Sequence, residues 1–319
     1  MHTEIQSTRE AFFRGMMELA ERDCRHVVVS ADSVKAARAT AFAEKYPDRL
    51  YEVGIAEQDA VGLAAGLAAG GLIPYVPTYA GFLTMRACEQ MRTFVAYPGL
   101  PVRFIGLNGG LFGGEREGVP HQFYEDLAIT RAMPGMTVLA PADAGQVYQA
   151  TLAMAEIDGP VYLRLGSGRE HVVYPESHPF YLDKAQVVKD TGADVAIFAS
   201  GFIMDRAFAA ADLLRSEGIG CKVVDVHTLY PLDILTITAV LEQVKGAVTV
   251  EDHNVIGGLG SAICETSAEY CPRPVYRIGL RDTFGRSGQP DELLDYYHIG
   301  IKDIAAAAQR VSGRIQHVD

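Results

Sequence analysis

The sequence lacks several features that would indicate particular classes of protein. It has no tryptophan, and 40 acidic against 28 basic side chains give its 319 residues a net charge of −12. No basic stripe stands out among these charges, which argues against nucleic-acid binding. The five cysteines form no CxxC pair, so neither a disulfide framework nor a structural zinc site is expected, and a reducing compartment is favoured. We expect the five thiols to be inert core residues.

Long hydrophobic runs are also missing. The most apolar stretch, 61–76, is interrupted by glycines and a proline and is too short to span a bilayer. The N-terminal segment MHTEIQSTREAFF lacks the basic start and apolar centre of a signal peptide. These absences predict a cytoplasmic protein. The composition, 49% hydrophobic and 21% charged, is that of a globular protein whose length suits two domains.

What the chain does have is a regular alternation of short β-branched runs with segments of helical periodicity. This alternation predicts α/β architecture, with two mainly parallel sheets flanked by helices. In the first half the predicted strands are 26–32, 72–78, 102–107, 136–141 and 161–166, and the helices are 9–22, 56–69, 84–96 and 144–156. In the second half the strands are 194–201, 221–229, 247–252 and 275–280, and the helices are 205–217, 234–244 and 261–270.

The segment 166–186 separates the two halves. It gathers proline, histidine and charged residues and loses periodicity, as an interdomain connection does. We therefore predict a first domain at 1–185, which includes this connection, and a second domain at 186–319.

One acidic residue is placed where a ligand could reach it. In YEVGIAEQDAVGLAAGLAAGG, at 51–71, Glu57 lies where a short strand turns into an apolar helix. Ligands of doubly wound sheets gather outside the carboxyl ends of the strands. A carboxylate among apolar residues is costly unless it is paired, hydrogen-bonded or protonated. Glu57 is therefore either a first-turn residue that complements the helix dipole or a residue that contacts a ligand.

Several motifs follow one another in a fixed order along the chain. They are STREAF, SADS, VGIAEQDAVGLAAGLA, PTYAGFLTMRACEQMR, GGEREGVPHQ with the block that follows it, and EDHNVIGGLGSAI. Through them the chain, from about residue 7 to its end, closely resembles the thiamine-diphosphate enzymes of the transketolase family, in their pyrimidine-binding and C-terminal domains. The resemblance implies that Glu57 shares a proton with the aminopyrimidine ring of thiamine diphosphate. An apolar wall suits this role, because burial strengthens a short hydrogen bond.

The resemblance assigns roles to further residues. Tyr79, in PTYAGF, stands where the family usually has a phenylalanine that stacks on the aminopyrimidine, and Phe82 is the alternative. Asp32, in SADS, matches an acidic position near the thiazolium, although a turn or cap residue is an equal alternative. His121, in VPHQ, matches a histidine that hydrogen-bonds the donor ketose. Glu117 falls where the family commonly has an aspartate that contacts sugar hydroxyls.

The expected phosphate contacts are only partly present. Arg9, in STREAF, matches a phosphate-binding arginine of the family. A second arginine expected after the strand GPVYLRLG is replaced by Ser167, with Arg164 and Arg169 on either side. Arginine and phosphate form charge-assisted, often bidentate bonds, so this replacement removes a main anchor unless Arg169 takes its place. The sequence therefore does not identify the donor and acceptor substrates.

A missing motif implies a partner. Complete transketolases carry a preceding domain whose GDG motif and later asparagine hold Mg²⁺ and the diphosphate, and the 319 residues contain no GDG. The resemblance thus implies a split enzyme: a separate subunit supplies the diphosphate domain and the Mg²⁺ ligands, in an α₂β₂ heterotetramer. The implied reaction transfers a two-carbon ketol unit from a ketose, phosphorylated or not, to an aldehyde, with Glu57 setting the cofactor's tautomer and His121 orienting the donor.

Other functions remain open alongside this one. Deoxyxylulose-phosphate synthases share the GIAEQ pattern but usually have histidine where this chain has Asp59. The β subunits of 2-oxo acid dehydrogenases are split in the same way, and transfer to a carrier thiol rather than an aldehyde is a further alternative. From another class, the chain would be a catalytically silent subunit that regulates a complete transketolase.

Overall fold

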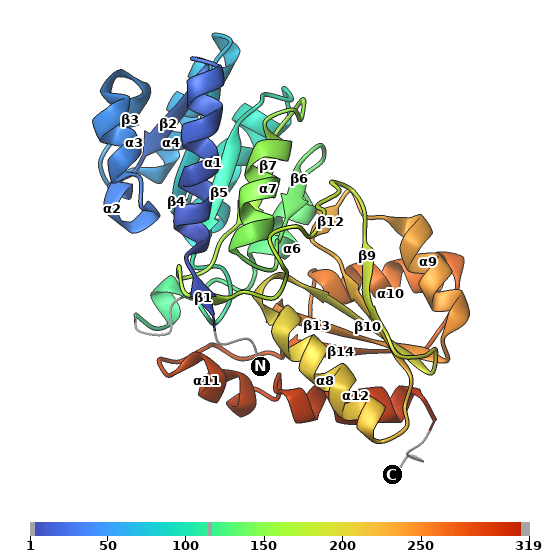
Figure 1. Ribbon diagram of the computed structural model, residues 1–319. Coiled ribbons are helices and arrows are strands. Elements are labelled where there is room, and N and C mark those ends of the chain that lie inside the picture. Colours follow the sequence, from blue (N-terminus) through green and yellow to red (C-terminus); the bar gives the residue numbers. More distant parts are fainter. Residues whose placement is uncertain (1–3, 114–116, 314–319) are drawn as a thin grey trace.

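The computed structural model describes residues 4–113 and 117–313, which form two sheets, each enclosed by helices (Figure 1). The first sheet has the strand order β12-β6-β7-β5-β4-β2-β3, and all its neighbouring strands are parallel except β12 and β6. Its strands are β2 (His26–Ser30), β3 (Leu50–Glu52), β4 (Ile73–Tyr79), β5 (Arg103–Leu107), β6 (Thr137–Leu139), β7 (Val161–Arg164) and β12 (Thr228–Tyr230).

The second sheet has the order β14-β13-β10-β11-β9, with only β9 antiparallel to its neighbour. The predicted α/β class with mainly parallel sheets is therefore confirmed. A short antiparallel ribbon of β1 (Ile5–Gln6) and β8 (Glu170–His171) ties the start of the chain to the connection between the halves. The strands of the second sheet are β9 (Gln186–Asp190), β10 (Val195–Ser200), β11 (Cys221–Asp225), β13 (Gly246–Asn254) and β14 (Val275–Leu280).

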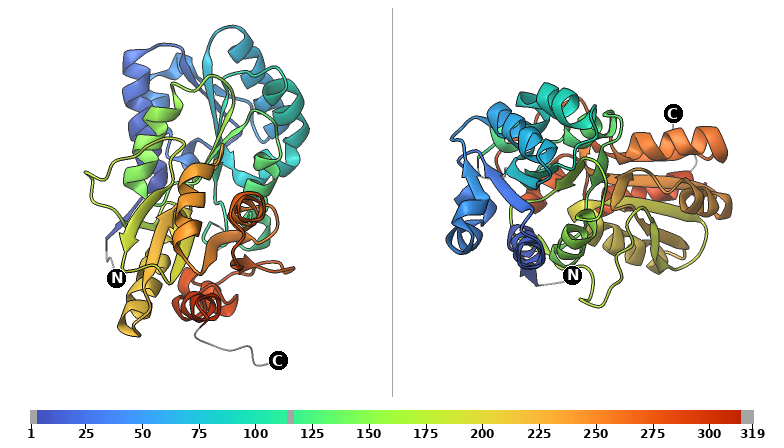
Figure 2. Two further views of the ribbon diagram at one scale, coloured as in Figure 1. Left: turned by 90° about the vertical axis from the view of Figure 1, so that its right-hand side faces the viewer. Right: turned by 90° about the horizontal axis from the view of Figure 1, so that it is seen from above.

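Helices cover both faces of each sheet (Figure 2). In the first sheet, α1 (Thr8–Arg22) and α7 (Ala144–Met154) pack on one face, while α4 (Glu57–Ala69) and helical turns over 82–96 pack on the other. In the second sheet, α8 (Met204–Ser216) and α12 (Ile301–Val311) cover one face, and α9 (Ile234–Gln243) and α10 (Leu259–Tyr270) cover the other. The shorter helices are α2 (Val34–Ala37), α3 (Thr40–Lys45), α5 (Cys88–Gln90), α6 (Asp126–Arg131) and α11 (Pro290–Tyr296).

Side-chain caps fix the start of several helices, but not of α4. Ser7 and Asp143 each accept a hydrogen bond from the backbone N–H three residues on, ahead of α1 and α7. Ahead of α4, Ala56 provides no side-chain cap, and the first turn instead contains Glu57 and Asp59. Negative charge at this position is favourable because the N-terminal end of a helix is positive. Glu57 thus begins the helix as the sequence predicted.

Three details differ from the sequence predictions. The predicted strand 221–229 is two strands: β11 stays in the second sheet, whereas β12 crosses to the edge of the first sheet and pairs with β6. The predicted helix 84–96 is divided into two π-helical turns, Phe82–Arg86 and Met91–Ala96, with α5 between them. Of the five cysteines expected in the core, only Cys221 and Cys271 are buried; Cys88 and Cys264 are half-buried and Cys24 is exposed, although all five thiols are free.

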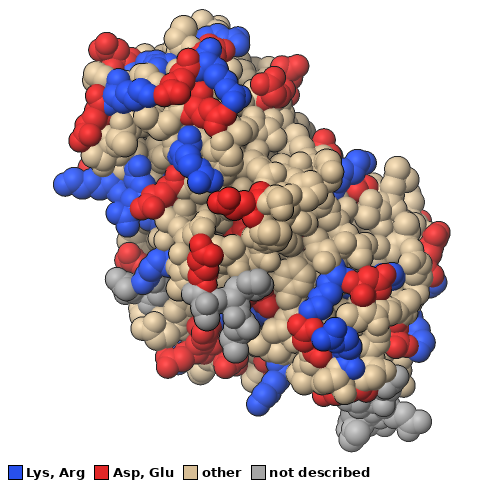
Figure 3. Space-filling model, viewed as in Figure 1, with Lys and Arg blue, Asp and Glu red and all other residues tan. Residues whose placement is uncertain are grey.

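The surface carries both signs of charge. On the face shown in Figure 3, lysine and arginine side chains are interspersed with aspartate and glutamate rather than gathered into a stripe. Within residues 4–113 and 117–313, no helix is both long and apolar enough to cross a membrane.

Candidate active site

The carboxyl ends of the parallel strands bring several predicted residues to one edge of the first sheet. Asp32 follows β2, Glu57 follows β3 and Tyr79 is the last residue of β4. The carboxylate of Glu52, at the end of β3, accepts hydrogen bonds from the backbone N–H groups of Asp32 (2.7 Å) and Gly54 (2.8 Å). This contact joins the loop after β2 to the loop that leads into Glu57.

Glu57 is buried but not alone. Its side chain is 2% exposed, and its Oε2 accepts a hydrogen bond of 2.6 Å from Nη1 of Arg86. The Arg86 side chain is itself 47% exposed, and its guanidinium lies 4.2 Å from the ring centroid of Phe82. The sequence predicted an acid in an apolar wall; the structure adds a basic partner, placed between the acid and solvent.

Three of the predicted residues form one aromatic cluster with Phe123. The rings of Tyr79 and His121 meet edge to face with centroids 4.8 Å apart, and Phe82 lies 5.5 Å from Tyr79 and 5.7 Å from His121. Phe123 packs 5.5 Å from Phe82 on the other side. A side chain at Gly81 would collide with the Phe123 ring, so glycine is required there. The cluster therefore connects His121 to Glu57 through Phe82 and Arg86.

Arg9 lies in the interior rather than at an open anion site. Its guanidinium donates to the carbonyl oxygens of Gly166 (3.1 Å) and Ala36 (2.8 Å) and to Oδ1 of Asn108. Burial lowers the pKa of Arg9, and the nearby Glu170 opposes that shift. Arg9 thus ties α2 to the loops after β5 and β7.

Asp32 and Glu117 are both exposed. Asp32 has a φ of 52°, a left-handed conformation that aspartate adopts more readily than most residues. Residues 114–116 of the GGEREGVPHQ block lie outside the described residues, and Glu117 directly follows them. The structure thus places Asp32 at the sheet edge with Glu57 and Tyr79, and it places Glu117 just ahead of the turn that carries His121.

Ser167 and Arg169 lie beside a small cavity near the β1–β8 ribbon. The cavity has a volume of about 330 Å³, and its apolar lining consists of Ile5, Phe112, Phe202 and Pro290. Arg169 is exposed, while the buried Glu170 accepts a hydrogen bond from the backbone N–H of Gly168 (2.8 Å). Arg169 and His171 therefore line the same cavity as Ser167, together with the acids Glu170 and Asp291.

A buried polar network lies behind the aromatic cluster and was not predicted. Arg164, on β7, forms an ion pair with Asp126 (3.0 Å) and donates to the carbonyl oxygens of Phe123 (3.2 Å) and Asp252 (2.9 Å). The Tyr162 hydroxyl donates to the same Asp126 carboxylate (2.6 Å). This network links the aromatic cluster to β13 of the second sheet.

The glycine-rich segment 253–262 runs from the end of β13 into the start of α10. Glu251, on β13, accepts hydrogen bonds from the N–H groups of Leu259 (2.7 Å) and Gly260 (2.8 Å) at the start of α10. Burial raises the pKa of Glu251 to about 7. Because a carboxylate of the chain already takes these N–H groups, the loop does not form a phosphate cradle.

Sequence reasoning missed Arg86, Asp126 and Asp252, although each lies within a motif that was recognised. Arg86 ends PTYAGFLTMR, Asp126 begins the block after VPHQF, and Asp252 lies in EDHN. The signal in the sequence that could have indicated these residues is the presence of a charged side chain inside a recognised motif. Their partners are 29 to 141 residues away in the sequence, which is why the pairing was not visible.

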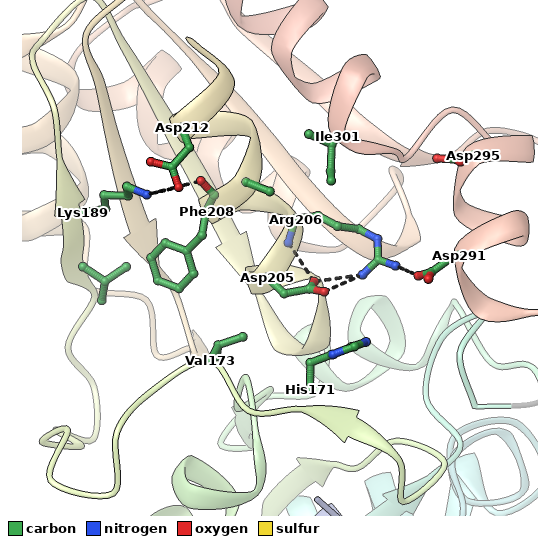
Figure 4. A pocket seen from close by; sticks show the side chains of 12 residues that line it. His171, Val173, Lys189, Asp205, Arg206, Phe208, Asp212, Asp291, Asp295 and Ile301 are labelled. Atoms are coloured by element: carbon green, nitrogen blue, oxygen red, sulfur yellow. Dashed lines mark hydrogen bonds and ion pairs between the residues drawn. The ribbon is translucent and has the colours of Figure 1, made fainter. Parts of the chain in front are cut away.

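A larger cavity than the one beside Ser167 lies elsewhere, beside α8. It has a volume of about 640 Å³ (Figure 4). Arg206 is paired with Asp205 and Asp291, and Lys189 with Asp212 (2.7 Å). Lys189 and Arg206 therefore both form ion pairs with aspartates that line the same cavity. None of the residues that line this cavity belongs to the aromatic cluster. Within the part of the chain that the structure describes, no group of three or more His, Cys, Asp or Glu is arranged to hold a metal ion.

Comparison with known proteins identifies the family. The profile described as "Transketolase, pyrimidine binding domain" matches residues 5–169, and "Transketolase, C-terminal domain" matches 183–304. The chain belongs to the transketolase family. A 6-deoxy-6-sulfo-D-fructose transketolase subunit from Clostridium sp. (strain MSTE9) is 38% identical, over 96% of this chain and 94% of that protein.

Two further similarities extend over nearly the whole chain. An apulose-4-phosphate transketolase subunit from Phocaeicola vulgatus is 34% identical, over 97% of this transketolase-family chain and 98% of that protein. A solved structure named "Split gene transketolase, inactive beta4 tetramer" matches with a TM-score of 0.89 and 38% identity, covering 97% and 99% of the two chains. The predicted resemblance is thus confirmed. The two relatives of matching length are named as transketolase subunits, and the similar solved structure is named as a split gene transketolase.

Proposed function

We propose that this chain is the pyrimidine-binding subunit of a split transketolase, which transfers a two-carbon ketol unit from a ketose to an aldehyde once a partner subunit is bound. The observation that carries the proposal is the buried Glu57 carboxylate at the carboxyl edge of the parallel sheet, joined through Arg86 to the cluster of Phe82, Tyr79 and His121.

The residues present fit thiamine diphosphate. A buried carboxyl at the start of α4 suits a proton shared with a ring nitrogen, and a half-buried phenyl ring beside it suits stacking on a flat heterocycle. Phe82 is the aromatic next to the guanidinium that pairs with Glu57, so we propose Phe82 as the principal stacking residue and Tyr79 as its support. When bound, thiamine diphosphate supplies the carbon nucleophile that this chain lacks.

The roles of the chain's own side chains follow from their positions. Glu57 holds a proton at a ring nitrogen and so fixes the tautomer. His121 meets the Tyr79 ring edge to face, which fixes the imidazole orientation and lets it hydrogen-bond a donor ketose. Asp32 and Glu117, both exposed, are proposed to face the thiazolium and the sugar hydroxyls, respectively.

A partner subunit is proposed to supply the diphosphate and Mg²⁺ site. Exposed apolar side chains lie close in sequence to Glu57, to its partner Arg86 and to His121: Ile55 (75% exposed), Met85 and Val119, respectively. Exposed apolar side chains around a site are typical of an interface. The name of the similar solved structure, a split gene transketolase in an inactive beta4 tetramer, fits a chain that needs its partner for activity. We propose an α₂β₂ assembly of the two subunits.

The substrate is proposed to carry an anionic end. The two relatives are named for 6-deoxy-6-sulfo-D-fructose and apulose-4-phosphate, which carry a sulfo group and a phosphate. Arg9 is buried, whereas Arg169 is exposed and lines the cavity that Ser167 also lines, so we propose Arg169 as the side chain that meets the anion.

Gentle recovery of the tagged chain from its host, followed by native mass spectrometry, tests this function. We expect a complex with a second chain that contains a GDG motif, together with thiamine diphosphate and Mg²⁺. In that complex Glu57→Gln should keep the fold and reduce ketol transfer by roughly 10²-fold or more. Asp59→Asn, an exposed acid in the same turn, is the matched control and should retain activity. A native complex without thiamine diphosphate that takes none up on addition would contradict the proposal and favour a regulatory subunit.

A further inference from the structure

The ion pair between Glu57 and Arg86 has no part in the proposed chemistry. Glu57 is almost fully buried, whereas half of the Arg86 side chain is in solvent, so the guanidinium covers the carboxylate on its open side. A ring nitrogen that is to share a proton with Glu57 must approach from this side. Arg86 therefore lies in the way of the ligand that the site is proposed to bind.

The guanidinium makes the two contacts that an aminopyrimidine would need. It is planar, it donates an N–H to Oε2 of Glu57 at 2.6 Å, and its central carbon lies 4.2 Å from the Phe82 ring centroid. Guanidinium groups stack on aromatic faces and pair with carboxylates through the same flat geometry. A flat nitrogen heterocycle bound between Glu57 and Phe82 would use the same acceptor and the same ring face.

The backbone of Arg86 is fixed while its tip is not. The Arg86 carbonyl accepts a hydrogen bond of 3.0 Å from Nε2 of Gln58, the second residue of α4. The Phe82–Arg86 turn is thus held against the helix that begins at Glu57. The exposed guanidinium can leave by side-chain rotation alone, without a change in the backbone.

We propose that Arg86 occupies the aminopyrimidine position in the free subunit and is displaced when thiamine diphosphate binds. This inference rests on the proposed function. Its physical basis is that a buried carboxylate without a partner is strongly destabilising, so the free subunit needs a substitute for the cofactor ring. The same contact then competes with the cofactor.

The inference predicts opposite effects on two quantities. Arg86→Met keeps an apolar stem on Phe82 but removes the ion pair, so the free subunit should melt a few degrees lower. The assembled complex should bind thiamine diphosphate about tenfold more tightly, because the fraction of open sites is no longer reduced by Arg86. A residue that binds the cofactor would have the opposite effect on affinity.

The test is calorimetric titration of the partner-bound complex with thiamine diphosphate in Mg²⁺ buffer, together with thermal melting of the free subunit. Arg92→Ala, an exposed arginine on the same helical stretch, is the control and should change neither quantity. Arg86→Lys should retain the ion pair and the melting temperature, with a smaller gain in affinity for thiamine diphosphate. This variant replaces Arg86→Met in the test if Arg86→Met does not fold.

The outcomes separate the two proposals. Wild-type complex that binds thiamine diphosphate, with Arg86→Met and Arg86→Lys both binding equally or more weakly, overturns the inference and leaves the proposed function intact. Wild-type complex that binds no thiamine diphosphate overturns both.

Discussion

Among single residues, the buried histidine His227 has the clearest consequence for stability. It lies between β11 and β12, its side chain is fully buried, and its ring packs 4.4 Å from that of Phe180. Nδ1 lies 3.1 Å from the Thr228 hydroxyl, while Nε2 has no hydrogen-bond partner among the described residues. Burial lowers the pKa of His227 to about 4; the nearby His178 adds to the shift and Asp183 opposes it.

The lowered pKa predicts a loss of stability in mild acid. Below pH 6.5 the unfolded chain takes up a proton on this histidine that the folded chain does not, so the free energy of unfolding falls as the pH decreases toward 4. Between pH 7 and pH 5 the decrease from this one residue is about 2 kcal/mol. His227→Gln removes the titrating group and should make the stability profile shallower by that amount.

Urea unfolding of the wild type and His227→Gln at several pH values measures the difference. The comparison is needed because Asp225, whose pKa burial raises to about 6, changes stability in the opposite direction over the same range. Parallel profiles for the two proteins would show that His227 is protonated equally in the folded and unfolded states.

Sequence alone predicted single residues only where a local pattern marked them. Glu57 follows a strand and precedes an apolar helix, and Tyr79 ends a strand, so each is visible within a short window. Arg86 and Asp252 were missed because their importance depends on partners far along the chain. His227 had no signal at all, since its burial results from β12 crossing to the first sheet.

Among the structural elements, the loop after β5 depends on the second domain. Oδ1 of Asp252, at the end of β13, accepts the N–H of Leu111 at 2.8 Å, and Oδ2 accepts that of Phe112 at 3.3 Å. Gly110 has a φ of +83°, and a Cβ there would lie 2.0 Å from the Asp252 carboxylate. This loop leads toward His121, so the second domain helps to place the first domain's site.

Removing this carboxylate should loosen the loop and destabilise the protein. Asp252→Ala leaves two N–H groups without their acceptor, at a cost of about 2–4 kcal/mol in the free energy of unfolding. Asp252→Asn keeps one carbonyl oxygen and should lose less. Urea denaturation measures both, with Asp48→Ala, an exposed aspartate, expected to stay within about 0.5 kcal/mol of the wild type. Equal stability of Asp252→Ala and the wild type would contradict the anchoring role.

Periodicity predicted most long elements because burial on one or two faces leaves a pattern in the sequence. It was wrong at 221–229, where a continuous apolar run hides the change of sheet between β11 and β12. It was also wrong at 84–96, because π-helical turns keep an α-like pattern over one or two turns. The position of the site at the carboxyl edge of the sheet could be predicted from the sequence, because the strands are parallel and their carboxyl ends meet at one edge.

In the whole molecule, the two domains share part of one hydrophobic core and are not merely in contact at a boundary. One continuous apolar cluster contains Phe104 of the first sheet and Phe198 of the second, and Leu229 of β12 lies within it, fully buried. The Arg164 guanidinium bonds to the carbonyl oxygen of Asp252 across the same boundary. The domain boundary predicted at 185/186 follows the sequence pattern. Strand β12, which lies after this boundary in the chain, nevertheless forms the edge of the first sheet.

This sharing predicts that both domains unfold together. The transition should be single, with equal calorimetric and van't Hoff enthalpies. Leu229→Ala removes buried volume at the shared boundary and should cost about 2–5 kcal/mol in the free energy of unfolding. Because the cluster belongs to both sheets, amide hydrogen exchange in β5 and in β10 should accelerate by the same factor. Acceleration in β10 alone, or two separate calorimetric peaks, would show instead that β12 is only an attached strand and that each domain is stable without the other.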